Sequence, residues 1–146
     1  MVVIRKREHN TLLFSIDNAI VDPQAKTLRP RPGIRNLISM ALSRKFTCIA
    51  VTQASQKEAE KTLRRLSCDN KKLVVVAGEN DNFYKTTIER LNILPQLCAA
   101  FDGSDNGIRI ARDAGISKII DLRDNPRPDR LRAELLNLCG LTPDRP

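Results

Sequence analysis

The stretch that decides the fold is Leu12-Leu13-Phe14-Ser15-Ile16-Asp17-Asn18-Ala19-Ile20-Val21-Asp22. Its apolar beginning passes into polar residues, and Pro23 follows directly as a turn signal. This is the pattern of a buried parallel strand that ends by delivering side chains to a pocket. We therefore expect a central strand here, with Ser15 and Asp17 near its carboxyl end.

The rest of the chain alternates between helical and extended patterns. Ser55 and Glu58 form a capping-box signature, which predicts the start of one of the helices. Further helices are predicted over 34–44, through Phe83–Leu91, around 110–114 and from Leu131 to a stop at Gly140, and strands over 46–51, 73–77, 98–101 and 118–122. This alternation predicts a three-layer α/β/α, Rossmann-like domain with a mainly parallel sheet. The residues expected to share that sheet are Leu13, Phe14, Ile16, Ile49, Val51, Val74, Val75, Val76, Ile119 and Ile120.

Length and composition fit a single domain of 146 residues. Within it, residues 1–10 are expected to form a basic N-terminal segment and residues 142–146 a loose tail. The chain has no apolar run long enough to span a membrane, and its first charges follow a short apolar piece, unlike a secretory signal. We expect an intracellular protein, cytoplasmic in the first place, with an organellar location left open. The four scattered cysteines are expected to be reduced and structural.

The positive charge is concentrated in the first half of the chain. Residues 1–74 carry 15 Lys and Arg against 6 Asp and Glu, a net of +9, whereas residues 75–146 carry 10 against 11, a net of −1. Such asymmetry suggests a polyanionic partner, RNA or DNA, or an acidic protein surface. The candidate contact residues are Arg5, Lys6, Arg7, Arg29, Arg31, Arg44, Lys45, Arg64, Arg65, Lys71 and Lys72.

The opening stretch also resembles the first motif of the haloacid dehalogenase (HAD) superfamily of phosphohydrolases. In that motif a strand ends in Asp-x-Asp-Gly-Thr, and the first Asp is the nucleophile that becomes an aspartyl-phosphate. Set on this pattern, Ser15 takes the nucleophile's position and Asp17 that of the second, acid/base Asp. Asn18 and Ala19 stand where Gly and Thr would be.

The resemblance continues to about Leu122. Arg31-Pro32-Gly33 and a helix precede Ile49-Ala50-Val51-Thr52, which is similar to the second motif and matches its phosphoryl-binding hydroxyl at Thr52. The third motif's Lys falls on Gly78. The fourth motif's Gly-Asp appears reversed as Asp102-Gly103, and its second acidic position falls on Gly107. The spacing leaves no room for a cap domain.

These replacements imply that the site has lost groups needed for phosphoryl transfer. Phosphoryl transfer at such a site uses a carboxylate nucleophile, Mg²⁺ held by carboxylates, and a Lys that offsets the negative charge. The pocket formed by Ser15, Asp17, Thr52, Gly78 and Asp102 is therefore expected to be vestigial, and no cofactor is expected. Weak Mg²⁺ binding by Asp17, Asp102 and Asp105 remains open. Residues 102–113 also satisfy a relaxed calcium-loop pattern, but the strand before them disfavours an EF-hand.

We interpret the chain as a capless HAD-like protein that has lost phosphohydrolase activity and acts as a binding or structural component, in a nucleic-acid-containing assembly. One alternative is a divergent phosphatase acting on polynucleotide or protein phosphate. Another is a regulatory module that senses a phosphorylated ligand. The chain has no Trp, one Tyr and four Phe, so nucleic-acid contacts would run mainly to phosphates. The oligomeric state is left open.

Overall fold

The computed structural model describes residues 2–4 and 6–143. Its elements follow one another along the chain as β1 (Val2–Ile4), β2 (Thr11–Ser15), the π-helical turn η1 (Ile16–Ile20), α1 (Ile34–Ser43), β3 (Thr47–Thr52), α2 (Gln56–Arg65), β4 (Val74–Ala77), α3 (Phe83–Leu91), η2 (Pro95–Leu97), β5 (Cys98–Asp102), α4 (Asp105–Asp113), β6 (Lys118–Asp121), α5 (Pro128–Leu138) and β7 (Leu141–Pro143). The predicted alternation of strands and helices is confirmed.

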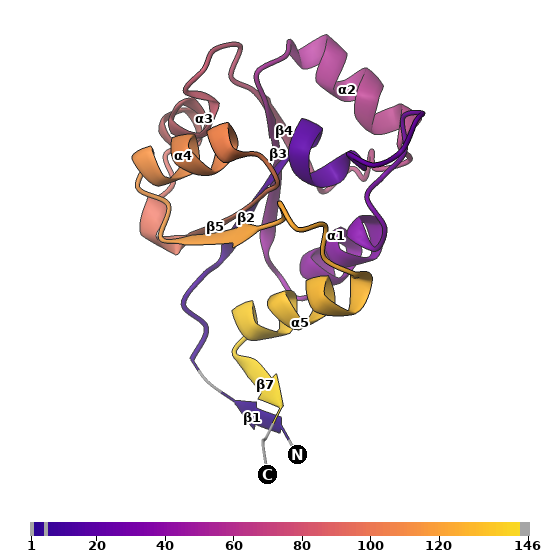
Figure 1. Cartoon of the computed structure of the whole chain (residues 1–146). Helices are drawn as coiled ribbons and strands as arrows, with labels where there is room; N and C mark the ends of the chain where they lie inside the picture. The colour runs from indigo at the N-terminus through magenta and orange to yellow at the C-terminus, as the bar shows by residue number, and fades with distance from the viewer. Residues whose placement is uncertain (1, 5, 144–146) are drawn as a thin grey trace.

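Five parallel strands form the central sheet in the order β4-β3-β2-β5-β6. β2 lies in the middle, where Leu13 is opposite Ile49 on one side and Ala100 on the other. Helices α1, α2 and α5 lie on one side of this sheet and α3 and α4 on the other (Figure 1). The three-layer α/β/α class predicted from the sequence is therefore confirmed. Only η1 and α1 separate β2 from β3, and only α2 separates β3 from β4, so no cap domain is inserted at either place.

The side chains of β2 alternate between two apolar cores. Leu12 and Phe14 pack into the core beneath α1, α2 and α5, whereas Leu13 packs into the core beneath α3 and α4. The Phe14 ring stacks on the Phe101 ring of β5, with centroids 4.7 Å apart. A strand that is covered on both faces needs apolar residues at every position, which explains the continuous run in the sequence.

Ser55 begins α2 as predicted. Its side chain accepts a hydrogen bond from the Glu58 backbone N–H at 3.2 Å and so satisfies one of the free donors of the first helical turn. The capping signature in the sequence therefore predicted correctly where this helix begins.

Two expectations about the sheet and the tail require correction. Ile16 is not in the sheet, because the chain leaves β2 at Ser15 and turns into η1. Val74 lies in the sheet as expected, although it belongs to the edge strand β4 and is 40% exposed. Thr142 and Pro143 are not loose chain: they pair with Val3 and Val2 in the antiparallel β1–β7 ribbon near the chain ends (Figure 1). Residues 144–146 lie outside the described residues.

All four cysteines are free thiols. Burial raises the pKa of the Cys48 thiol to about 12, so this side chain behaves as a small apolar residue of the core. Within residues 2–4 and 6–143, every helix is too short and too polar to cross a membrane.

Candidate functional site

The candidate site lies at the carboxyl end of β2, where the strand order changes direction. The chain runs outward from β2 through β3 to β4 and then returns to β5 on the other side of β2. In open α/β sheets, the crevice at such a switch point is the usual place for a ligand. A small pocket of about 50 Å³ is found here, lined by Ser15, Asp17, Asn18, Thr52, Gln53, Phe83, Ser104, Asn106 and Gly107.

Ser15 is the last residue of β2 and the cap of η1. Its hydroxyl accepts a hydrogen bond from the Asn18 backbone N–H at 3.2 Å, and the residue is almost fully buried. No histidine, lysine or carboxylate side chain bonds to this hydroxyl in the described structure. Serine becomes a nucleophile only beside a base that takes its proton. Its contacts therefore identify Ser15 as a capping residue.

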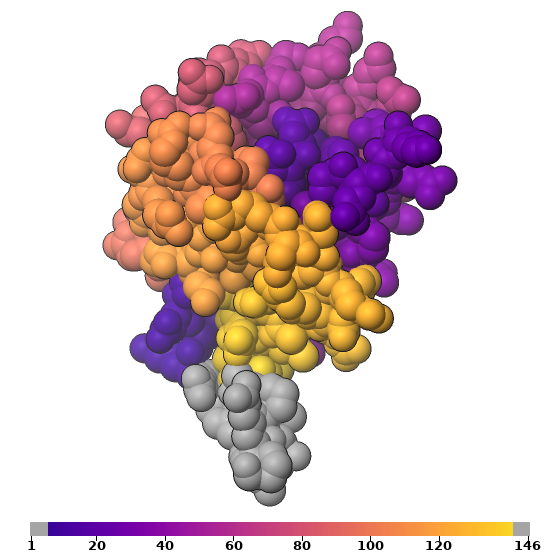
Figure 2. Space-filling view, in the orientation of Figure 1, coloured from indigo at the N-terminus to yellow at the C-terminus, as the bar shows by residue number. Residues whose placement is uncertain are grey.

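Asp17 and Thr52 meet across the ends of β2 and β3. The Thr52 hydroxyl lies 3.4 Å from a carboxylate oxygen of Asp17 and also accepts the Ala54 backbone N–H at 3.1 Å. Thr52 is buried, whereas Asp17 is exposed at the rim of the pocket. In Figure 2, the chain just after β2 (indigo) reaches the surface between the orange α4 segment and the magenta α2 segment.

Asp102 ends β5 and is completely buried. The Tyr84 hydroxyl donates to one of its carboxylate oxygens at 2.6 Å, while the backbone N–H and the hydroxyl of Ser104 reach the other at 3.0 and 3.2 Å. Burial raises the pKa of Asp102, and the hydrogen bonds from Tyr84 and Ser104 oppose this rise. Burial and the adjacent carboxylate raise the pKa of Tyr84, which therefore stays protonated and donates. Asp102 does not line the pocket.

Comparisons with known proteins show which proteins this chain is similar to. No family model matches the chain. A phosphorylated carbohydrates phosphatase from Thermotoga maritima is 29% identical over 102 residues, which cover 65% of this chain and 47% of that protein. The chain thus spans about half the length of this curated relative.

Solved structures extend the likeness to the fold as a whole. A Thermotoga maritima protein provisionally assigned as a β-phosphoglucomutase superposes with a TM-score of 0.74 at 17% identity, over 88% of this chain and 99% of that one. The cobalt-bound deoxy-D-mannose-octulosonate 8-phosphate phosphatase of Haemophilus influenzae gives 0.64 at 8% identity, over 92% and 91%. A provisionally assigned HAD superfamily hydrolase of subfamily III A from Legionella pneumophila gives 0.56 at 10% identity, over 91% and 85%.

The chain has the haloacid dehalogenase-like fold. The expectation drawn from the sequence motifs is therefore confirmed at the level of the fold. Of the five residues predicted for the vestigial HAD pocket, Ser15, Asp17 and Thr52 are brought together, whereas Gly78 and Asp102 lie outside its lining.

The glycines at three HAD motif positions are closely packed. A Cβ added to Gly78, the position of the motif Lys, would lie 2.6 Å from Phe83 Cβ. One added to Gly103 would lie 2.6 Å from the Asn18 carbonyl oxygen and 2.9 Å from Arg31 Nη2. At Gly107 it would lie 2.2 Å from Asp102 Oδ2. Real Cβ atoms do not approach this closely, so neighbouring groups fill the space that motif side chains would need.

The cation site predicted at Asp17, Asp102 and Asp105 does not form. Asp102 is enclosed by Tyr84 and Ser104, and Asp105 forms an ion pair with Arg123 at 2.7 Å. Across residues 2–4 and 6–143, no three His, Cys, Asp or Glu side chains converge as metal ligands would. Asp17, Asp102 and Asp105 therefore do not share one cation in the described structure. The calcium-loop pattern is interrupted as well, because α4 already begins at Asp105.

Asn18, Gln53, Phe83, Ser104 and Asn106 line the HAD-like pocket but were not foreseen. Ser104 had a readable signal, since Ser before an apolar-periodic segment is typical of a helix start. Its hydroxyl accepts the Gly107 backbone N–H at 2.9 Å and caps α4. Asn18 and Gln53 directly follow the predicted Asp17 and Thr52, whereas Phe83 and Asn106 reach the pocket from α3 and α4 and had no comparable signal.

The eleven residues predicted to contact a polyanion differ in how exposed they are. Exposed side chains are found at Lys6, Arg29, Arg44, Lys45, Arg64, Arg65, Lys71 and Lys72. Arg31 is 3% exposed, so the prediction that it contacts a partner is wrong. Its guanidinium instead donates to the carbonyls of Asn18 and Ala19, both at 3.0 Å, and to Asn125 Oδ1 at 3.3 Å. Arg7 is half-buried and lies 3.6 Å over the Phe46 ring. Arg5 lies outside the described residues.

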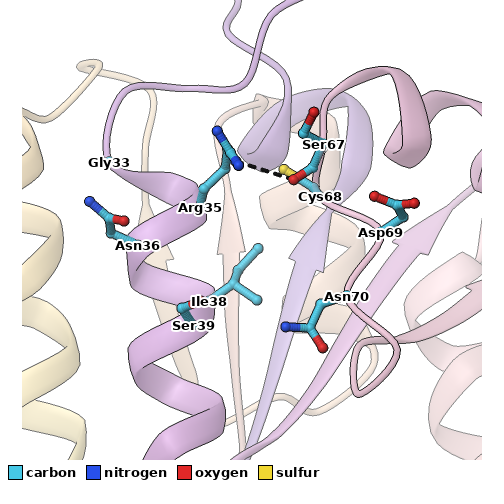
Figure 3. Close-up of a pocket in the computed structure, with 9 residues that line it drawn as sticks. All are labelled: Gly33, Arg35, Asn36, Ile38, Ser39, Ser67, Cys68, Asp69 and Asn70. Carbon is cyan, nitrogen blue, oxygen red and sulfur yellow. Dashed lines mark hydrogen bonds between the residues drawn. The ribbon is translucent and has the colours of Figure 1, made fainter.

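Wider hollows are found elsewhere on the molecule, one of them beside the end of β6. Figure 3 shows one of about 580 Å³ between the first turns of α1 and the turn at 67–70, where Arg35 Nε donates to the Ser67 carbonyl at 3.1 Å. Gly33 is the one residue of the quoted HAD motifs that lines this hollow. The position of the candidate site is therefore set by the strand ends and not by the size of the cavity.

Proposed function

We propose that this chain is a noncatalytic HAD-like domain that acts by binding. The observation that carries the proposal is Ser15, which stands at the nucleophile position with its hydroxyl engaged as the cap of η1 and without a neighbouring base. An acyl-phosphate forms only on a carboxylate, so a serine at this position cannot make the intermediate of HAD phosphohydrolases, and without a base its hydroxyl is also a poor nucleophile for forming a phosphate ester.

Two further features support this proposal. The carboxylates at the strand ends do not converge on one cation, so the charge of a transferred phosphoryl group would not be balanced by a metal. Gly78 contributes no cation in place of the motif Lys, and Lys85 on the following helix is exposed and 4.0 Å from Glu89. Nucleophile, metal and lysine act as one unit in this chemistry, and this chain has neither the carboxylate nucleophile nor the motif Lys at the matching positions.

A test of the proposal is hydrolysis of sugar phosphates and of p-nitrophenyl phosphate by the purified protein in the presence of Mg²⁺. We expect phosphate release no faster than that from an Asp17→Asn variant, which keeps the fold but lacks the carboxylate. Release by the wild type that Asp17→Asn abolishes would overturn the proposal.

A second candidate function is a divergent phosphatase for phosphorylated carbohydrates. The 29% identity to the Thermotoga maritima phosphatase favours it. The same assay separates the two candidates, because a phosphatase would show saturable turnover on at least one of the sugar phosphates.

The variant Ser15→Asp tests whether the missing nucleophile is the only defect. We expect it to remain inactive, because the effects of groups that act as a unit are strongly non-additive. Phosphate release should stay at the wild-type level in Mg²⁺, while circular dichroism shows an unchanged fold. Strong activation by this single substitution would show that the metal and lysine functions survive in other residues.

A further inference from the structure

The charged residues that flank the central sheet are divided between its two edges. The connections leading into β2, β3 and β4 contain Lys6 and Arg7, Arg44 and Lys45, and Lys71 and Lys72, with Glu8 and Asp69 as their acids. At the opposite end, where the strands finish, charges of both signs are mixed: the acids are Asp17, Asp22, Glu79, Asp81, Asp102, Asp105, Asp121 and Asp124, and the cations are Lys26, Arg29, Arg31, Arg123 and Arg127. The three connections that lead into β2, β3 and β4 therefore carry a local excess of cations, across the sheet from the HAD-like pocket.

Five exposed cations lie in the connections that lead into β2, β3 and β4; we call Lys6, Arg44, Lys45, Lys71 and Lys72 the basic row. These strands are consecutive neighbours in the sheet, with Thr11 opposite Thr47 and Ile49 opposite Val74, so the three connections enter the sheet side by side. Arg7 joins the first two, because its Nη1 donates to the Arg44 carbonyl at 2.7 Å.

The cations of the basic row are not neutralised within the described structure. The ion pairs found in residues 2–4 and 6–143 involve Lys85, Arg109, Arg123, Arg127 and Arg130, and none includes a member of the row. Arg123 and Arg130, at the opposite edge, are both paired with aspartates. Because these cations are unpaired, an anionic ligand can bind them without breaking any existing ion pair.

The burial of the aromatic residues determines which part of a nucleic acid the protein could contact. Phe14, Phe46, Phe83, Tyr84 and Phe101 are all buried, so the surface offers no ring on which a base could stack. Contacts would run to phosphates, which position a nucleic acid but carry no sequence information. An acidic protein would present carboxylates with no regular repeat, whereas the phosphate backbone of a nucleic acid presents a negative charge at every nucleotide.

We propose that the basic row binds the phosphate backbone of RNA or DNA without sequence preference, at the edge of the sheet opposite the HAD-like pocket. This inference rests on the proposed binding function, and it names the partner class and the surface. Because the surface shares no residue with the pocket, binding would be independent of any ligand held there.

The test uses fluorescence anisotropy with a labelled single-stranded RNA and a labelled DNA duplex across a salt series. With about four or five phosphates neutralised, the logarithm of the association constant for the duplex should fall against the logarithm of salt with a slope of about −4. The variant Lys71→Glu/Lys72→Glu should weaken binding roughly 10- to 100-fold and reduce the slope by about 2.

The matched control is Lys26→Glu/Arg29→Glu, which makes the same change in net charge in the exposed loop that follows η1. It should change affinity less than about threefold, and both variants should keep the wild-type melting temperature. Equal weakening by both pairs would overturn the assignment of the surface. Absence of binding at low salt, or equal binding to poly-glutamate, would overturn the nucleic-acid partner. Neither result bears on phosphate release, so the two proposals fail separately.

Discussion

Replacement of Arg31 with methionine is expected to lower the free energy of unfolding by about 2–5 kcal/mol. The guanidinium is buried and donates to Asn18, Ala19 and Asn125. These partners lie in η1 and in the loop before α5, so one side chain joins segments that are far apart in the chain. Methionine fills a similar volume but leaves the buried Ala19 carbonyl without its donor and removes the partly buried bonds to Asn18 and Asn125.

The matched control is Arg29→Met. Arg29 is only two residues away in the same loop but is exposed, so we expect a change within about 0.5 kcal/mol. Chemical denaturation of both variants would measure the difference. Similar small effects in the two would mean that the Arg31 guanidinium is solvated and free to contact a partner, as the sequence pattern had suggested.

The second large effect is expected for Tyr84→Phe, which removes the hydroxyl that donates to Asp102. The free energy of unfolding should fall by about 1–3 kcal/mol near neutral pH, because a fully buried carboxylate loses its shortest hydrogen bond. The phenylalanine ring itself fits the same space, so cavity formation adds little. Guanidinium denaturation at about pH 7.5 would measure this loss.

The cost of Tyr84→Phe should depend on pH. Burial raises the pKa of Asp102 above its usual 3.8, so the folded state holds this proton more tightly than the unfolded state does. The stability contributed by Asp102 therefore increases as pH falls from neutrality towards 3.8 and decreases as pH rises through the raised pKa. Loss of the Tyr84 bond raises that pKa further, so the difference in stability between the variant and the wild type should shrink as the pH falls from neutrality towards 3.8.

Thr87→Val serves as the control for this pH dependence. The Thr87 hydroxyl is buried on the same helix and donates to the Phe83 carbonyl at 2.7 Å, with no carboxylate involved. Its loss should cost about 1 kcal/mol equally across this pH range. A pH-independent cost for Tyr84→Phe as well would contradict an ionised Asp102 in the folded protein.

The fold was readable from the sequence because its signals are local. The continuous apolar run of β2 indicates a strand covered on both faces, and Ser55 with Glu58 marks a helix start, whatever lies elsewhere in the chain. The error at Ile16 and the exposure of Val74 both lie beyond such local signals. An apolar residue next to a strand carries no sign of whether the ladder continues, or of whether a strand lies at the edge of the sheet.

The site was less readable, because its decisive contacts join residues that are distant in the sequence. Arg31 is 13 residues from Asn18 and 94 from Asn125, so its burial could not be seen in the Arg-Pro-Gly pattern. Asp102 looked like a metal ligand at a strand end, yet Tyr84, 18 residues earlier, encloses it. The motifs placed Ser15, Asp17 and Thr52 together correctly, because the ends of neighbouring parallel strands always meet.

The most direct test of a noncatalytic site is a single-turnover experiment with the protein in excess over a radiolabelled sugar phosphate in Mg²⁺. Excess protein removes any limit from slow product release and detects a single chemical event. A site with Ser15 in place of the nucleophile predicts phosphate release at the buffer rate, the same for the wild type and for Asp17→Asn. Release by the wild type above the buffer rate, lost in Asp17→Asn, would contradict the central claim.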